Sequence, residues 1–402
     1  MGLLGQVSSA VNKVPHGFKH SKEDAPPEGA HADDMEELDE ESGNILMSLI
    51  SQLRIGMDLS KVTLPTFVLE PRSMLERVTD FLSHPDLIFG ADKLDNPEER
   101  FIAIMTYYMS GWHIKPKGVK KPYNPILGEF FRCSYTYPDG TVGVYIAEQV
   151  SHHPPISAYY YVSPQNNVLI YGDLRPKSKF LGNSAATLMG GTSHIVMLNR
   201  PEDGEYLISM PNMYARGILF GKMVLELGDH SEVTNVANDI SSTVEFKVKG
   251  YFTGTYNAIG AKVVHRGQTV GELSGKWNES VEYKDSKTGS TRVLFNSKTL
   301  QAVRKDTVPL NEQEPNESQR LWAKVTEGIK EKNMEKATQY KTEIEEAQRE
   351  AARQRQTTGQ AWQPRFFIVH GDRFIPNMSA LPEMYCPPAA QQYFANELTK
   401  AT

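Results

Sequence analysis

The chain has 402 residues, enough for two or three average domains or for one large domain with appendages. Its formal charge is 43 minus 49, or −6, which argues against bulk binding of nucleic acid. The two cysteines, Cys133 and Cys386, exclude a disulfide framework and a cysteine-rich zinc site. There is no signal-peptide pattern and no apolar run of about eighteen residues, so we expect a cytoplasmic protein whose membrane contacts are peripheral.

The first sixty residues predict a tail and a lid. Residues 1–32 have the composition of a mobile tail, whereas residues 33–60 begin with seven acids in the nine residues 33–41. Such an acidic run is usually a solvated, self-repelling segment. Behind Ser42 or Asn44 as a cap, helical spacing predicts an amphipathic helix with the apolar residues Ile45, Leu46, Leu49, Ile50 and Leu53. A helix of this kind can close over an apolar opening, while the acids before it are repelled by anionic lipid.

Residues 61–128 predict a connector and two helices. The apolar stretch 59–71 is typical of an extended connector. Ser73 is a cap for a helix over 74–83, and Asn96 with Pro97 begins a longer helix that reaches Met109. A basic loop follows, with four lysines between residues 115 and 121.

From residue 129 to residue 305 the apolar period changes to two. Val244, Phe246 and Val248, for example, alternate with charged residues, and about ten such runs are separated by Gly, Asn, Asp or Pro. The predicted strands are 142–147, 156–162, 167–171, 193–198, 206–209, 218–227, 244–249, 257–264, 268–275 and 292–296. This pattern predicts an α+β protein with a large antiparallel, incompletely closed β-barrel, which can enclose a ligand.

Residues 306–402 predict a C-terminal helical region and tail. One helix is expected over 318–330 and a second over 334–355. In the second helix, Lys341, Glu345 and Arg349 repeat every four residues and form one row beside the apolar stripe. The row is an ordinary ion-pair ladder unless a ligand lies beneath it. A final strand is predicted near 362–369, and the last thirty residues read as irregular.

The stretch Glu148-Gln-Val-Ser-His-His-Pro-Pro155 places two adjacent imidazoles between strand-like runs. The two rings can hold a phosphate or a metal, or the stretch can be a plain surface turn. Side chains alternate across a strand, so both rings face one ligand only if the backbone bends there. No His, Asp or Glu stands near at an informative spacing for a metal, and no catalytic motif occurs along the chain. The sequence therefore predicts a binder, not an enzyme, with no cofactor and no metal.

The same stretch, with Lys121-Pro-Tyr-Asn124-Pro-Ile-Leu-Gly-Glu129 and Lys341-Thr-Glu-Ile-Glu345-Glu-Ala-Gln-Arg349, resembles the oxysterol-binding-protein-related lipid-transfer family over roughly residues 42–370. Further blocks, such as Leu64-Pro-Thr-Phe-Val-Leu, are most similar to the short yeast Osh carriers. The resemblance implies a barrel enclosing one lipid under an N-terminal lid. It implies phosphoinositide contacts from Lys121, Asn124, His152, His153, Lys341, Glu345 and Arg349, and phosphatidylserine contacts from Leu64, Val68, Lys121, Asn124 and Ser178.

The implied activity is exchange of phosphatidylserine for phosphatidylinositol 4-phosphate between membranes. Exposing two chains of about sixteen carbons costs on the order of 25 kcal/mol, so a carrier must bury them again. The alternatives are a sterol and phosphatidylinositol 4-phosphate exchanger of the same fold, a phosphoinositide-responsive sterol sensor or scaffold, and a lipid-modifying enzyme. We expect a monomer that contacts anionic membranes transiently at contacts between endoplasmic reticulum and plasma membrane, with a tether protein as a further partner.

Overall fold

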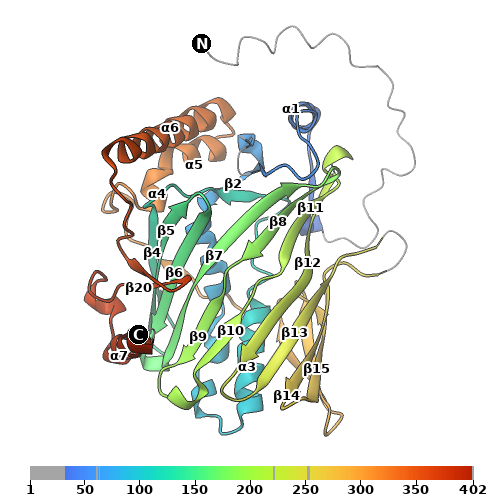
Figure 1. Cartoon of the computed structure of the whole chain (residues 1–402). Helices are drawn as coiled ribbons and strands as arrows, with labels where there is room; N and C mark the ends of the chain where they lie inside the picture. The colour runs from blue at the N-terminus through green and yellow to red at the C-terminus, as the bar shows by residue number, and fades with distance from the viewer. Residues whose placement is uncertain (1–31, 60–61, 63, 221, 251–253, 401–402) are drawn as a thin grey trace.

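One large antiparallel sheet dominates the structure, a computed structural model that describes residues 32–400 except 60–61, 63, 221 and 251–253. Sixteen strands form it, in the path order β17-β16-β15-β14-β13-β12-β10-β9-β7-β6-β5-β4-β18, with β1, β8 and β11 attached beside it. In the described part of the chain the end strands β17 and β18 are not hydrogen-bonded to each other. The predicted α+β fold with an incompletely closed antiparallel barrel is therefore confirmed (Figure 1).

Most predicted strands appear at or near their expected positions. The strands are β1 (Met35–Glu37), β4 (Phe130–Thr136), β5 (Val142–His152), β6 (Pro155–Ser163), β7 (Val168–Phe180), β8 (Ser184–Gly190), β9 (Ser193–Met197), β10 (Glu205–Ile208), β11 (Asn212–Arg216), β12 (Lys222–Asn235), β13 (Ile240–Lys247), β14 (Ala258–His265), β15 (Gln268–Lys276), β16 (Ser280–Asp285), β17 (Thr291–Asn296) and β18 (Lys305–Asp306). The expected strand 218–227 was wrong at its start, because Ile218–Phe220 forms a 3-10 turn.

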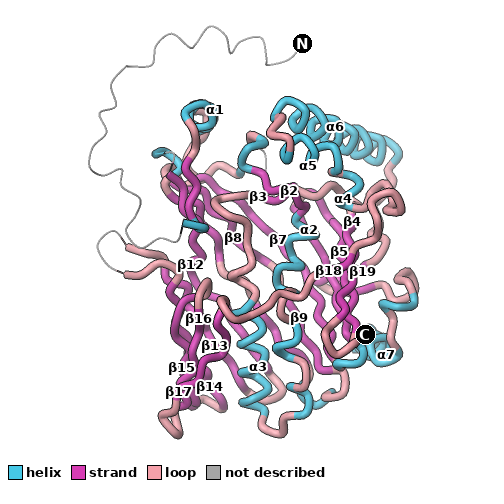
Figure 2. Tube along the Cα trace, turned by 180° about the vertical axis from the view of Figure 1, so that it is seen from behind, coloured by secondary structure: helices cyan, strands magenta, loops and turns pink. Residues whose placement is uncertain are grey.

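Two helices lie against the concave side of the sheet, between its two edges (Figure 2). They are α2 (Met74–Arg77), continued by a 3-10 segment Val78–Leu82, and α3 (Pro97–Ser110). Both predicted caps are confirmed: the Ser73 hydroxyl accepts from Leu75 N at 3.4 Å, and Asn96 accepts from Glu98 N at 2.9 Å. The apolar faces of these helices pack on inward-facing strand residues inside the barrel.

Strands β5, β6 and β7 are buried on both faces. On β5, Tyr145 and Ala147 face the interior, whereas Val144 and Ile146 pack outside against the C-terminal segment. That segment contains β19 (Phe367–His370), β20 (Arg373–Pro376) and α7 (Pro388–Lys400). The expectation that the last thirty residues are irregular was wrong, because Ala390 and Phe394 of α7 complete this outer core.

The C-terminal helices before that segment largely follow the prediction. The expected helix 318–330 is divided at Trp322 into α4 (Ser318–Leu321) and α5 (Ala323–Lys330). The next helix, α6 (Met334–Thr358), ends at Gly359, whose φ of 67° favours glycine. Helix α6 and the N-terminal helix α1 (Glu40–Ile50) lie at the same end of the sheet (Figure 1).

Helix α1 packs through one face onto the end of the sheet. Leu46 and Ile50 are buried, with Leu53 partly buried, in a cluster that includes Phe180, Ile218 and Met223. Leu49 is half-buried, and Ile45 points outward with 45% of its surface exposed. The expected caps Ser42 and Asn44 were wrong, because the Asp39 side chain accepts from Ser42 N and begins the helix.

The acidic leader is paired with the basic loop. Strand β1 adds to β12 in antiparallel register. Asp34 contacts Lys115 at 2.6 Å, and Glu36 contacts Lys120 at 2.6 Å. The Glu36 carboxylate also accepts from Val119 N at 3.1 Å. Part of the leader is therefore folded against lysines, which a solvated, self-repelling segment would not be.

Candidate functional site

A β-bulge shapes the turn that carries the two histidines. The register between β5 and β6 shifts between Gln149 and Ser151. Gln149 fixes this bulge, because its amide donates to Ser151 O at 2.8 Å and accepts from the Ser157 hydroxyl at 2.6 Å. The backbone thus bends as the adjacent rings require: the centroids of His152 and His153 are 4.5 Å apart. His152 is partly buried and His153 is exposed at the surface.

Basic side chains converge on the same place from two other elements. Strand β3 (Lys121–Tyr123) pairs in parallel with β2 (Leu69–Ser73) and carries Lys121, with the exposed Asn124 directly after it. Burial lowers the pKa of Lys121, and the positive charge of Lys341 lowers it further, while Glu345 opposes the shift. Lys121 of β3 and Lys341 of α6 therefore face one site, although 220 positions separate them.

The row on α6 has the predicted geometry. Glu345 contacts Lys341 at 2.7 Å and Arg349 at 3.5 Å, so one carboxylate lies between two cations. Glu345 also favours the charged form of Lys121. We call the set Lys121, Asn124, His152, His153, Lys341, Glu345 and Arg349 the headgroup site. Its donors suit a phosphate, whose oxygens form charge-assisted hydrogen bonds.

A buried carboxyl at the start of β4 was assigned no role from the sequence. Glu129 accepts hydrogen bonds from Ser73 Oγ at 2.5 Å, Ser318 Oγ at 2.7 Å, Trp322 Nε1 at 2.9 Å and Ile126 N at 3.0 Å. Burial raises the pKa of Glu129, and the four donors oppose that rise. Glu129 therefore joins β2, β4 and α4–α5. The signal in the sequence was an acid at the start of an apolar strand.

Gln348 is a second residue that was assigned no role from the sequence. It accepts from Leu127 N at 2.8 Å, and its amide nitrogen lies 2.7 Å from His152 Nε2. The other ring nitrogen of His152 lies 3.2 Å from Pro125 O. Gln348 stands seven residues after Lys341 and hence on the same helix face, which is the signal that was available.

The expected phosphatidylserine residues lie in the segment after α1 and on β7. Leu64 and Val68 are half-buried and flank Thr66, whose hydroxyl lies 3.4 Å from Thr338 of α6. Ser178 is half-buried on β7 opposite Thr187 of β8. The next residue, Lys179, forms an isolated bridge with Asp58, and Asp58 favours the charged form of Lys121. Asp58 thereby connects the Ser178 region with the headgroup site.

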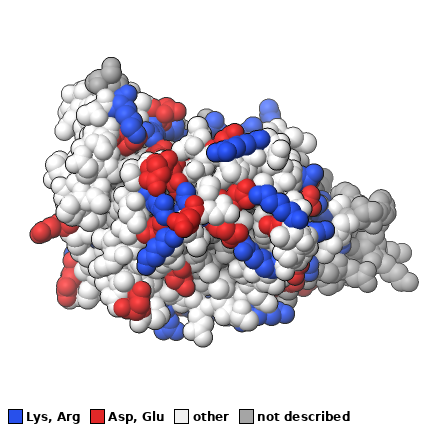
Figure 3. Space-filling view, turned by 90° about the horizontal axis from the view of Figure 1, so that it is seen from below, with Lys and Arg blue, Asp and Glu red and all other residues white. Residues whose placement is uncertain are grey.

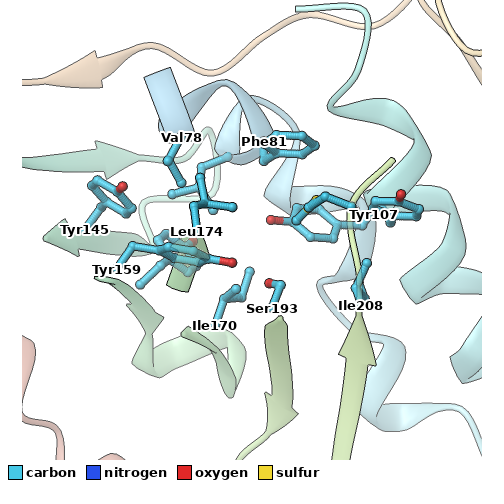
Figure 4. A pocket seen from close by; sticks show the side chains of 13 residues that line it. Val78, Phe81, Tyr107, Tyr145, Tyr159, Ile170, Leu174, Ser193 and Ile208 are labelled. Atoms are coloured by element: carbon cyan, nitrogen blue, oxygen red, sulfur yellow. The ribbon is translucent and has the colours of Figure 1, made fainter. Parts of the chain in front are cut away.

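Inside the barrel lies an apolar cavity that is rich in tyrosine (Figure 4). It is lined by Val78, Phe81, Leu82, Tyr107, Tyr108, Tyr145, Tyr159, Tyr161, Ile170, Leu174, Ser193, Ile208 and Met210. Its free volume is about 30 Å³, far below the roughly 300–1,000 Å³ of typical ligand pockets. A lipid chain therefore enters this space only when lining side chains change rotamer.

Most hydroxyls at this cavity are satisfied within the protein. Tyr108 donates to Ser231 Oγ at 2.6 Å, and Tyr145 donates to Leu75 O at 3.0 Å. For the Tyr107 hydroxyl, no hydrogen bond is found within the described ranges 32–59, 62, 64–220, 222–250 and 254–400. It faces the cavity together with Tyr159 and Ser193 (Figure 4).

Other kinds of site receive little support from the described residues. Among them, no group of three or more His, Cys, Asp or Glu side chains is arranged to hold a metal ion. Across the same part of the chain, no helix has the length and apolarity needed to cross a membrane. On the end opposite α1 and α6, acidic and basic side chains are mixed (Figure 3), so that end presents no surface of a single sign for a charged partner.

These features define a lipid-binding protein of the oxysterol-binding protein family, to which the chain belongs. The model of the oxysterol-binding protein family matches residues 48–379. The chain is 48% identical to an oxysterol-binding protein homolog of Schizosaccharomyces pombe, covering 86% of this chain and 74% of that protein. It is 42% identical to oxysterol-binding protein homolog 6 of Saccharomyces cerevisiae, covering 90% and 81%.

A solved structure supports the same assignment. The ORD domain of Osh1 in complex with ergosterol aligns with a TM-score of 0.70 and 25% identity, covering 84% of this chain and 86% of that one. The predicted family membership is therefore confirmed by both sequence and fold.

Proposed function

We propose that this protein extracts one lipid at a time and exchanges phosphatidylserine for phosphatidylinositol 4-phosphate between membranes. The observation that carries the proposal is the headgroup site beside a lid and an apolar barrel interior. Lys121, Lys341 and Arg349 supply three cations, and His153 offers an exposed ring, at the end of the molecule where α1 packs. A phosphorylated headgroup binds at this end, and its acyl chains enter the barrel.

One barrel interior makes the two ligands mutually exclusive, which is the basis of exchange. Lys121 and Asn124 belong to both proposed ligand sets, so either headgroup occupies them at one time. The similarity to homologs 6 and 7 of Saccharomyces cerevisiae, at 42% and 44% identity, supports assignment to the same branch. No nucleophile and base pair is needed, so the activity is transfer without chemistry.

The expected cellular setting completes the proposal. The protein acts as a monomer in the cytoplasm and contacts anionic membranes transiently where endoplasmic reticulum and plasma membrane meet. A tether protein at these contacts is a further proposed partner. The lipid-binding domain comprises residues 33–402, with 1–32 as an N-terminal tail.

Mass spectrometry of lipids that co-purify with the protein tests the ligand assignment. Phosphatidylserine and phosphatidylinositol 4-phosphate are expected, and ergosterol alone would contradict the proposal. Replacement of both His152 and His153 by Ala should abolish phosphatidylinositol 4-phosphate extraction while phosphatidylserine transfer persists in part. Equal loss of both activities in a folded double variant would count against separate headgroup sets.

A sterol is the second candidate ligand, and one observation favours it. The buried Tyr107 hydroxyl faces the cavity and is available to pair with a sterol hydroxyl. The Osh1 domain, which aligns at 25% identity, was solved in complex with ergosterol. Tyr107→Phe separates the two ligands, because it should weaken sterol uptake and leave transfer of phosphatidylserine unchanged.

A further inference from the structure

Gln348 forms the middle of a hydrogen-bond chain that begins and ends on backbone groups. Leu127 N lies 2.8 Å from Gln348 Oε1, and Gln348 Nε2 lies 2.7 Å from His152 Nε2. His152 Nδ1 in turn lies 3.2 Å from Pro125 O. A backbone N–H can only donate and a backbone carbonyl can only accept, so both ends of the chain are fixed.

The fixed ends determine the protonation state of His152. Because Leu127 N–H is a donor, the Gln348 atom that faces it is the amide oxygen. The amide nitrogen of Gln348 therefore faces the ring of His152. That nitrogen can only donate, so His152 Nε2 must be an acceptor. The carbonyl of Pro125 requires the proton on Nδ1. His152 is therefore a neutral imidazole, and both its nitrogens are engaged by the protein itself.

The surroundings of His152 favour the same state. Burial lowers the pKa of His152, and the neighbouring His153 lowers it further. The bond to Pro125 O and the charge of Glu345 on α6 oppose this shift without reversing it. On α6, Glu345 also pairs with Lys341 and Arg349, so its negative charge is shared among cations. As held, His152 has no N–H group for an anionic ligand.

We propose that Gln348 is a positioning residue that keeps His152 neutral until a phosphomonoester arrives, and that binding then takes up one proton. The proton comes from solvent and adds to His152 Nε2, the Gln348 amide releases that nitrogen, and the new N–H donates to a phosphate oxygen. The inference rests on the proposed function for the ligand. Extraction of the phosphomonoester lipid and extraction of phosphatidylserine should respond differently to pH, because only the phosphomonoester accepts a hydrogen bond from the His152 imidazolium.

Histidine NMR of the lipid-free protein tests the positioning role. At about pH 7 the ¹⁵N shifts of His152 should report the neutral form with Nδ1 protonated. Gln348→Met should raise the pKa of His152, and Gln348→Glu should raise it more, because its carboxylate accepts from Nε2–H. Gln339→Met is the matched control, since Gln339 lies on the same helix and its amide donates to the exposed Glu343 at 3.0 Å. A spectrum unchanged by Gln348→Met, or an Nε2-protonated ring in the wild type, would overturn the role.

Lipid extraction tests the proton uptake separately. With phosphatidylcholine vesicles that contain phosphatidylinositol 4-phosphate, wild-type affinity should rise as pH falls from about 8 to about 6, by up to about tenfold per unit. Gln348→Glu should flatten this slope, and phosphatidylserine extraction should vary little in either protein. Extraction without a pH slope would overturn the proton uptake. No extraction at any pH would instead overturn the proposed phosphoinositide function, while the NMR result still decides the role of Gln348.

Discussion

The proposed headgroup site and helix α1, the proposed lid, lie at the same end of the barrel, yet they are held by different forces. In the headgroup site, His152 is held by hydrogen bonds to Gln348 and to Pro125 O, and Gln348 in turn accepts from Leu127 N. Helix α1 is held by a small apolar cluster around Leu46 and Ile50, and the leader before it is held by ion pairs to lysines. Apolar contacts are non-directional and can re-form. A buried hydrogen-bond network, in contrast, loses much of its stabilising free energy when one member leaves. We therefore expect the first region to serve recognition and the second to open.

Substitution of Glu129 should have the largest effect, because its buried carboxylate joins β2 and α4 to the start of β4. Glu129→Leu removes the acceptor of four donors, including the buried indole of Trp322, and of these the Ser318 hydroxyl can still donate to Phe130 O at 3.2 Å. We expect the free energy of unfolding to fall by about 3 kcal/mol or more. Urea denaturation measures this change. Glu317→Gln is a suitable comparison, since Glu317 is also buried but pairs with the partly exposed Arg132, and it should cost less.

Ile50 should produce an intermediate effect that is confined to the lid. Ile50→Ala removes apolar contact with the cluster that contains Phe180 and Met223, at a cost of about 2 kcal/mol for closure. Release of a fluorescent lipid should then be about thirtyfold faster. Ile45→Ala on the same helix is the control, because that side chain is 45% exposed. Equal acceleration by both variants would show that α1 does not close through its buried face.

Leu64 tests whether the two ligands use different parts of the opening. Leu64→Asp places a carboxylate at a half-buried position beside α6. We expect phosphatidylserine extraction to weaken by about tenfold, or about 1.4 kcal/mol, and phosphatidylinositol 4-phosphate extraction to change less. Vesicle extraction with each lipid measures both values. Equal loss of the two ligands would contradict the assignment of Leu64.

The regular parts of this fold were predictable because their signal is local. In strand β13, Val244 and Phe246 alternate with charged residues. The helix cap at Asn96 was predicted from Asn96 and Pro97, which are adjacent in the sequence. Strands β8 and β11 were missed because they are half-exposed and lack alternation. Strand β16 was missed although Val281 and Tyr283 alternate there.

The proposed members of the headgroup site came from the sequence, but the contacts that hold them did not. The row on α6 follows from helical spacing, and the resemblance supplied the remaining residues. The bonds between Gln348 and His152, and between Glu36 and Lys120, join positions far apart in sequence. Sequence periodicity carries no information about such long-range pairs, and so the contacts of the leader with the basic loop were not predicted.

Substitutions in the acidic leader should have the smallest effect. They distinguish repulsion of anionic membranes by the acids from masking of lysines by the same acids. Its acids were expected to repel anionic leaflets, but Glu36 also covers Lys120, with 2.6 Å between Oε1 and Nζ. Each lysine released near such a surface contributes about 1 kcal/mol, so Glu36→Gln should lengthen residence on phosphatidylserine vesicles by up to about fivefold. Glu40→Gln removes the same charge from an exposed position on α1. Repulsion alone predicts equal residence times for the two variants, measured by vesicle flotation or surface plasmon resonance. A longer residence time for Glu36→Gln than for Glu40→Gln indicates masking, because only the first variant frees a lysine. Added salt should then reduce the difference between the two residence times.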